Sequence, residues 1–144
     1  MYNTILVAVD LSKDSEKVID KAVAVVKGDT SKIHLVHVVE PVAAAYSMDI
    51  YAVNINELQQ EAISMAEQKL KEVAQRLKIA ETQVHTLLGS PAPEIRNLAT
   101  EIEAQAIVMG SHGHSGWKIL LGSTATKVLH GATCDVLTIH VGKD

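Results

Sequence analysis

The chain alternates between short apolar runs and segments in which apolar residues recur every three or four positions. A run that does not alternate with polar residues is typical of a strand covered on both faces, as in a parallel sheet. Such a run occurs at Thr4–Val9, and four further apolar segments predict strands at Ile33–Val39, Val84–Leu88, Ala106–Met109 and Val136–Val141.

Each interval between these runs is long enough for a helix. In the first interval Ser12 is the predicted N-cap and Gly28 the predicted stop. Ser90, which precedes a proline, predicts the start of the third helix, and the last helix is predicted from about Thr124 to His130. The second helix is the longest, and its predicted buried stripe consists of Leu58, Ala62, Met65, Leu70, Val73 and Leu77.

Strict alternation of strand and helix predicts a single doubly wound α/β domain over residues 1–144, with a parallel sheet and helices on both faces. In such sheets ligands bind beyond the carboxyl ends of the strands, where the strand order reverses. Asp10, Val38 and Gly110 all lie at predicted strand ends. We therefore expect them at one edge of the sheet.

The segment from Glu40 to Ile55 has no clear hydrophobic period. A connection of this length in a compact domain is often a lid or a binding loop. A mobile surface loop explains the same residues equally well, so both interpretations stay open.

The fourth predicted strand ends in a glycine-rich stretch, Gly110-Ser111-His112-Gly113-His114-Ser115-Gly116, and Gly122-Ser123-Thr124 precede the last helix. Glycines let the backbone approach a ligand closely, and clustered N–H groups near a helix start attract anions. One glycine is enough for a tight turn, whereas this density of glycines favours a phosphate cradle. The sequence contains neither the Walker P-loop pattern nor the dinucleotide-binding G-x-G-x-x-G pattern.

Composition narrows the range of partners. The chain is 47% hydrophobic and 21% charged, which is ordinary for a globular protein. A net charge of −4 without a basic block counts against a nucleic-acid partner. The lone Cys134 precludes an internal disulfide and is expected to be a buried, inert thiol. Because no signal peptide or long apolar span is visible, we expect no membrane partner and a cytoplasmic location.

The strand ends resemble those of a known family. The sequence ILVAVDLS at residues 5–12 resembles the opening of a universal stress protein domain, and HVV at 37–39 resembles the end of its second strand. IVMGSHG at 107–113, followed by LGS at 121–123, is similar to the family signature. Taken with the strand–helix alternation, this resemblance implies a five-stranded sheet of order 3-2-1-4-5.

Nucleotide-binding members of that family share the pattern G-x2-G-x9-G-[S/T]. This chain keeps the three glycines at Gly110, Gly113 and Gly122, but the second spacer (114–121) has eight residues where the pattern has nine. We interpret the shorter loop as a variant and not as the loss of a site. The resemblance therefore implies that ATP is the ligand, with Mg²⁺ as an open question.

The resemblance also implies residue roles. Asp10 would contact the ribose or adenine side of the ligand, and the backbone of Val38 would meet the adenine. Ala8 and Val9 would line the base pocket. The remaining contacts would be to the ribose or the phosphates, from Met109, Gly110, His112, Gly113, Gly122, Ser123 and Thr124.

Several residues have a simpler interpretation as well. Asp10 also suits a turn or cap before the first helix, and the two roles can coexist. His112 and His114 lie two apart, but no cysteine or carboxylate stands at ligand spacing beside them, so we interpret them as exposed or phosphate-neighbouring imidazoles. The other histidines that we considered are interpreted as structural or superficial: His34, His85, His130 and His140.

The leading hypothesis is a homodimeric adenine-nucleotide-binding protein of stress regulation or sensing. The family resemblance implies that the last strand, from Asp135 to His140, pairs across the dimer, and an uncovered apolar edge strand is an aggregation liability. A dimeric interaction protein with a vestigial pocket is the first alternative. A slow ATPase or self-phosphorylating protein is the second, although no Ser-His-Asp set or carboxylate pair is evident and no catalytic residue is assigned.

Overall fold

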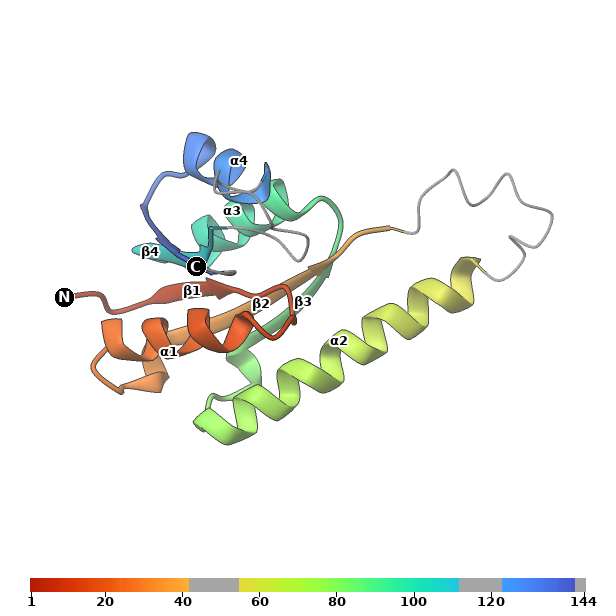
Figure 1. The fold of residues 1–144 in the computed structure, drawn as a ribbon, viewed down its shortest axis with the longest axis horizontal. Coiled ribbons are helices and arrows are strands. Elements are labelled where there is room, and N and C mark those ends of the chain that lie inside the picture. Colours follow the sequence, from red (N-terminus) through yellow and green to blue (C-terminus); the bar gives the residue numbers. More distant parts are fainter. Residues whose placement is uncertain (42–54, 112–122, 142–144) are drawn as a thin grey trace.

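The computed structural model describes residues 1–41, 55–111 and 123–141, and the predicted alternation of strands and helices is confirmed there (Figure 1). Each predicted strand is present within two residues of its expected ends. The observed elements are β1 (Ile5–Ala8), α1 (Ser15–Val25), β2 (Ile33–Val39), α2 (Ile55–Leu77), β3 (Val84–Leu88), α3 (Pro91–Glu101), β4 (Ala106–Gly110), α4 (Ser123–Gly131) and β5 (Asp135–Ile139).

The five strands form one parallel sheet in the order β3-β2-β1-β4-β5, as predicted. The chain first moves from β1 outward to β3 and then returns to β4 on the other side of β1. The strand order therefore reverses between β1 and β4, which places the topological switch point at the carboxyl ends of these two strands.

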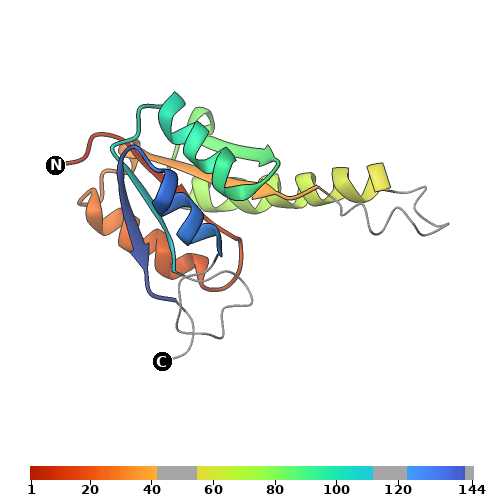
Figure 2. The same cartoon turned by 90° about the horizontal axis from the view of Figure 1, so that it is seen from above.

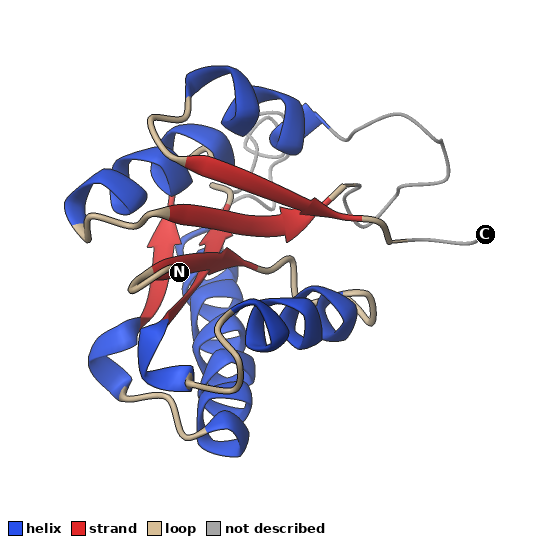
Figure 3. Ribbon diagram, turned by 90° about the vertical axis from the view of Figure 1, so that its left-hand side faces the viewer, coloured by secondary structure: helices blue, strands red, loops and turns tan. Residues whose placement is uncertain are grey.

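Helices cover both faces of the sheet (Figure 3). Ile5 and Val7 of β1, with Val9 just after the strand, belong to the core cluster beneath α1 and α2, whereas Leu6 belongs to the cluster beneath α3 and α4. This division follows from the alternating direction of side chains along a strand. Strands β1 and β4 are apolar throughout because both of their faces are buried, whereas β2 carries two histidines and β5 is largely exposed.

The predicted buried stripe of α2 is wrong in its first half. Leu58 and Met65 are 52% and 61% exposed, and the buried residues of the helix are Ala66, Leu70 and Ala74. The first turns of α2 project past the end of the sheet, so nothing in the described chain covers them (Figures 1 and 2). The hydrophobic periodicity identified the helix correctly, but it did not show which part of the helix packs against the sheet.

Gly28 follows the end of α1, as predicted, and both Gly28 (φ 82°) and the residue before it have left-handed backbone angles. Lys27 has a φ of 54°, and the N–H of Gly28 donates to the carbonyl of Val23. This bond pattern is a Schellman motif, which normally has glycine where Lys27 stands. Lys78 after α2 and Glu103 after α3 repeat it, with φ of 60° and 56°.

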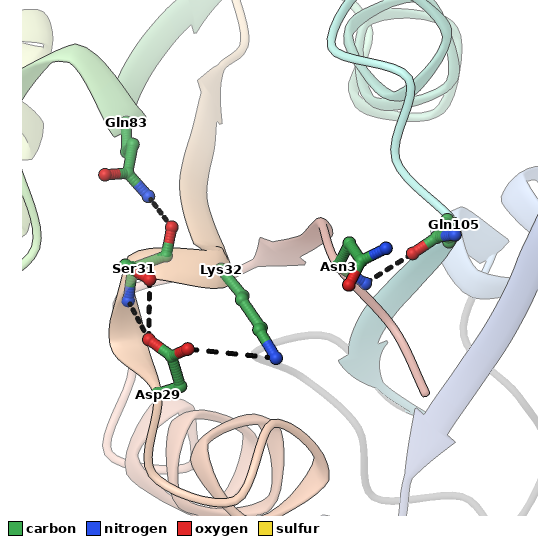
Figure 4. A network of polar contacts seen from close by, with 6 residues as sticks. All are labelled: Asn3, Asp29, Ser31, Lys32, Gln83 and Gln105. Atoms are coloured by element: carbon green, nitrogen blue, oxygen red, sulfur yellow. Dashed lines mark hydrogen bonds and ion pairs between the residues drawn. The ribbon is translucent and has the colours of Figure 1, made fainter.

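The amino end of the sheet is closed by side chains that satisfy backbone groups (Figure 4). Asp29 accepts hydrogen bonds from the backbone and side chain of Ser31, and the N–H of Asn3 donates to Gln105. The amide of Gln83 donates to the carbonyls of Ser31 (2.9 Å) and Ile33 (2.7 Å). Gln83 thus ties the turn before β3 to the start of β2.

Replacing Gln83 with alanine is expected to lower the free energy of unfolding by about 1–2 kcal/mol, because two carbonyls lose their donor. Urea denaturation measures this change. Gln68→Ala is the matched control, since the exposed amide of Gln68 makes only a 3.5 Å contact with Glu72. Equal unfolding midpoints for the two variants would show that the Gln83 contacts contribute nothing.

Candidate functional site

The carboxyl ends of β1, β2 and β4 meet at the switch point. The registers Val7↔Val108 and Ala8↔Val36 place the ends of β4 and β2 on either side of β1. Continued by one residue, the first register sets Ala8 beside Met109. The structure therefore brings together the strand-end residues predicted to form the site.

Ala8 and Met109 lie on the α3/α4 face of the sheet. Met109 is buried, and Ala8 is half-buried against the same core cluster, which also includes Val38. Three of the predicted site residues thus share one face of three neighbouring strands. A flat apolar ligand beyond these strand ends would meet this face.

Val9 lies differently, because its side chain belongs to the α1/α2 core. Its N–H donates to the carbonyl of Val36 (3.0 Å), and its own carbonyl lies 2.8 Å from Nδ1 of His37. A carbonyl only accepts, so Nδ1 of His37 carries the proton. Both backbone groups of Val9 are therefore engaged with β2, and its side chain faces away from Ala8.

The peptide groups of Val38 face β1. In a parallel strand the N–H and C=O groups of every second residue point to the same neighbour. The carbonyl of Val36 accepts from β1, whereas the carbonyl of Val39 accepts from Gly89 on the β3 side. Val38 shares the direction of Val36, so its backbone faces the place where β1 leaves the sheet.

Asp10 organises the turn between β1 and α1. Its Oδ1 accepts from the N–H of Ser12 (3.0 Å), the hydroxyl of Ser12 (2.6 Å) and the hydroxyl of Ser15 (3.0 Å). The predicted N-cap role of Ser12 is wrong, because α1 begins at Ser15 and Asp14 occupies the cap position. The turn interpretation of Asp10 is confirmed, and its carboxylate is exposed at the sheet edge.

Helix α4 starts at the same edge as the strand ends. It leads into β5, which runs parallel to β4, so α4 runs antiparallel to the strands and Ser123 and Thr124 lie at their carboxyl side. Its first turn contains no acidic residue. Backbone N–H groups at such a terminus, together with two hydroxyls, suit an anionic ligand.

The other end of α4 is held by α3. Nη1 of Arg96 donates to the carbonyl of Lys127 (2.8 Å). The guanidinium lies so close to Gly131 that a Cβ there would come within 2.3 Å of Nη1. Neither Arg96 nor Gly131 was singled out from the sequence. A glycine at a helix end was the one available signal, and it has a commoner explanation as a cap.

Some predictions fall outside the described residues. His112, Gly113 and Gly122 lie there, as does most of the segment from Glu40 to Ile55. Ser111 is described and buried, and its hydroxyl accepts from the N–H of Val141 at 3.4 Å. Cys134 is half-buried, and burial raises the pKa of its thiol, which keeps it in the unreactive protonated form.

Two further surveys cover only the described part of the chain. Within 1–41, 55–111 and 123–141, no group of three or more histidine, cysteine, aspartate or glutamate side chains is placed to hold a metal ion. No helix in these ranges is long and apolar enough to cross a bilayer.

Fold and strand ends together define the class as a doubly wound α/β protein with a candidate ligand site at its switch point. The universal stress protein family model matches residues 1–140, and the chain belongs to this family. Universal stress protein A homolog 1 of Coxiella burnetii is 39% identical over 139 residues, covering 96% of each chain. Universal stress protein YxiE of Bacillus subtilis is 34% identical over 150 residues, covering 97% of this chain and 100% of the relative.

Solved structures agree with this assignment. The hypothetical protein MJ0577, whose biochemical function was assigned from its structure, superposes with a TM-score of 0.83 at 25% identity, covering 100% of this chain and 99% of the other. A universal stress protein in complex with cAMP has a TM-score of 0.69 at 26% identity, covering 98% and 99%. UspA of Lactobacillus plantarum shares the fold, with a TM-score of 0.78 at 21% identity, covering 96% of this chain and 99% of the other.

Proposed function

We propose that this universal stress protein binds ATP or a related adenine nucleotide at the switch point and acts as a dimeric regulator or sensor in a single domain. The observation that carries the proposal is that β1 and β4 end side by side and that α4 begins at the same edge of the sheet. The three pattern glycines occur in the same part of the sequence. A structural relative bound to cAMP supports the adenine nucleotide class.

The described residues divide into a base side and a phosphate side. Ala8, Met109 and the backbone of Val38 would face the adenine and ribose, because they share the α3/α4 side of the strand ends. Val9 would serve as part of the wall only, since its backbone groups are engaged. Asp10 would meet the ribose while it holds its turn.

The phosphates would lie at the start of α4. Ser123 and Thr124 would supply N–H and hydroxyl donors, and Gly110 at the end of β4 would let the backbone approach the ligand. The remaining proposed contacts are His112, Gly113 and Gly122. Hydroxyl and carboxylate oxygens suit Mg²⁺, and Asp10 and Thr124 are the described candidates to hold it beside a triphosphate.

A homodimer through β5 is the proposed assembly. This strand is at the edge of the sheet, and its Leu137 is 36% exposed, with the 49% exposed Leu129 of α4 nearby in sequence. An apolar edge strand without a partner invites pairing with another chain. A second copy related by a twofold axis would continue the sheet with an antiparallel strand.

Denaturing the purified protein and identifying any released small molecule tests the ligand directly. Calorimetric titration of the emptied protein with ATP, ADP, AMP and cAMP then gives the affinities, and a bound nucleotide should also raise the melting temperature. No heat with any of them would refute the proposal and favour the interaction protein with a vestigial pocket. Phosphate release or incorporation over hours would identify a slow ATPase or self-kinase.

A further inference from the structure

A pair of histidines lies on the sheet away from the switch point. His34 is the second residue of β2 and His85 the second residue of β3, at the amino ends of these strands. Both alternate with residues of the α3/α4 core, Val36 on β2 and Leu87 on β3, so they stand on that face. Nothing in the proposed nucleotide site uses them.

The two rings face each other edge to edge. Nδ1 of His34 lies 3.0 Å from Nε2 of His85, and the ring planes are within 12° of parallel, with centroids 5.3 Å apart. This distance is that of a hydrogen bond, so one of the two facing nitrogens carries a proton and the other offers its lone pair. Two nitrogen donor atoms thus converge on one small space.

Imidazole binds copper, nickel and zinc ions through the lone pair of a neutral ring. Each ring of the pair presents one nitrogen to the other, so either ring can offer a lone pair to the space between them. Glu101 at the end of α3 is a charged group that acts on His85, and its negative charge favours a cation there.

We propose that Nδ1 of His34 and Nε2 of His85 form a binding site for a divalent transition-metal ion of the copper, nickel and zinc group. The ion would replace the proton between the rings, and that proton would move to the other nitrogen of the same ring. Net charge on the protein would not change in this step. Water would complete the coordination, because both side chains are only half-buried.

The nitrogen separation indicates which ions fit best. With metal–nitrogen bonds of about 2.0–2.1 Å, nitrogens 3.0 Å apart subtend about 95° at the metal. This angle suits neighbouring positions of a square-planar or octahedral ion better than the tetrahedral angle that Zn²⁺ prefers. The usual order of affinities runs the same way, so we expect Cu²⁺ to bind most tightly, followed by Ni²⁺ and Zn²⁺.

The backbone holds the pair in place. Strands β2 and β3 are hydrogen-bonded neighbours with Leu35 opposite Val84 and Val36 opposite His85. Rotation of the two rings about their side-chain bonds would admit an ion between the facing nitrogens. The second nitrogen coordinates at a high effective concentration, and a two-point site of this kind should bind about a hundredfold more tightly than a single histidine.

Calorimetric titration of the protein with NiCl2 or CuCl2 alone at pH 7.5 tests this site. His85→Gln and His34→Gln should each weaken binding about a hundredfold, because each leaves one ligand. His130→Gln is the matched control, because His130 is exposed on α4 and far from the pair in sequence, and this variant should bind nickel as the unaltered protein does. Cu²⁺ should also broaden the ring proton signals of His34 and His85 selectively in NMR spectra.

The opposite pattern overturns the inference. If nickel affinity falls in His130→Gln and is unchanged in His85→Gln, the cross-strand histidines are not a metal site. Equal affinities for His34→Gln, His85→Gln and the unaltered protein would have the same meaning. The result is independent of nucleotide binding, since neither variant touches the switch point.

Discussion

Replacing both Gly113 and Gly122 with valine is expected to weaken ATP binding by about 10–100-fold, the loss that one or two charge-assisted hydrogen bonds would cause. Glycine lets backbone N–H groups approach a phosphate, and a branched side chain on the same backbone keeps them away. Gly122 directly precedes the first turn of α4, where the phosphates would lie. Calorimetric titration with ATP measures the effect.

The same loop offers a matched control. Gly116 lies in the glycine-rich stretch but outside the pattern of Gly110, Gly113 and Gly122, so Gly116→Val should retain ATP affinity. Affinity for AMP should fall less than affinity for ATP in the double variant, because AMP lacks the outer phosphates. A double variant that folds and binds ATP normally would show that the glycines form an ordinary loop.

Thr138→Pro is expected to turn the proposed dimer into a monomer. The N–H of Asp135 and the carbonyl of Ile139 face β4, so residues 135, 137 and 139 bond inward and residues 136 and 138 face the open edge. Proline at 138 removes an outward N–H and leaves the ladder with β4 intact. Because the change occurs twice in a symmetric dimer, the dissociation constant of the dimer should rise by about 10–100-fold.

Sedimentation equilibrium over a range of concentrations measures this shift. Thr138→Val keeps the N–H and serves as the control, with unchanged association expected. Leu137→Pro should instead destabilise the fold, because its N–H faces β4. A Thr138→Pro protein that associates as before would exclude β5 as the interface, and a protein that is monomeric without any substitution would exclude the dimer itself.

Much of the fold follows from local sequence. Apolar residues dominate Ile33–Val39 and Val84–Leu88 although histidines interrupt both segments, and these two strands were located to the residue. The helix stripe through Leu58 and Met65 failed because periodicity shows that a helix has an apolar side but not that another element covers it. Whether the apolar side of α2 is buried depends on where the helix lies relative to the sheet.

The candidate site was predictable only in its strand ends. Asp10 and Gly110 stand next to apolar runs, and this local signal marks the carboxyl edge of a parallel sheet. The contact of His37 with Val9 spans 28 residues of sequence, that of Arg96 with Lys127 spans 31, and that of His34 with His85 spans 51. Such pairs depend on the strand register and on helix packing, which no single-sequence pattern specifies.

The opposed directions of Ala8 and Val9 have a consequence for how this chain can change. Ala8, Met109 and Val38, which are proposed to face the base, lie on one layer of the sheet, whereas α1 and α2 pack with the side chain of Val9 on the other. Substitutions in that second layer can remodel its outer surface, including the uncovered turns of α2, while the recognition layer keeps its shape. The two sides of the sheet can thus diverge separately, so that one side keeps its ligand while the other gains new binding partners.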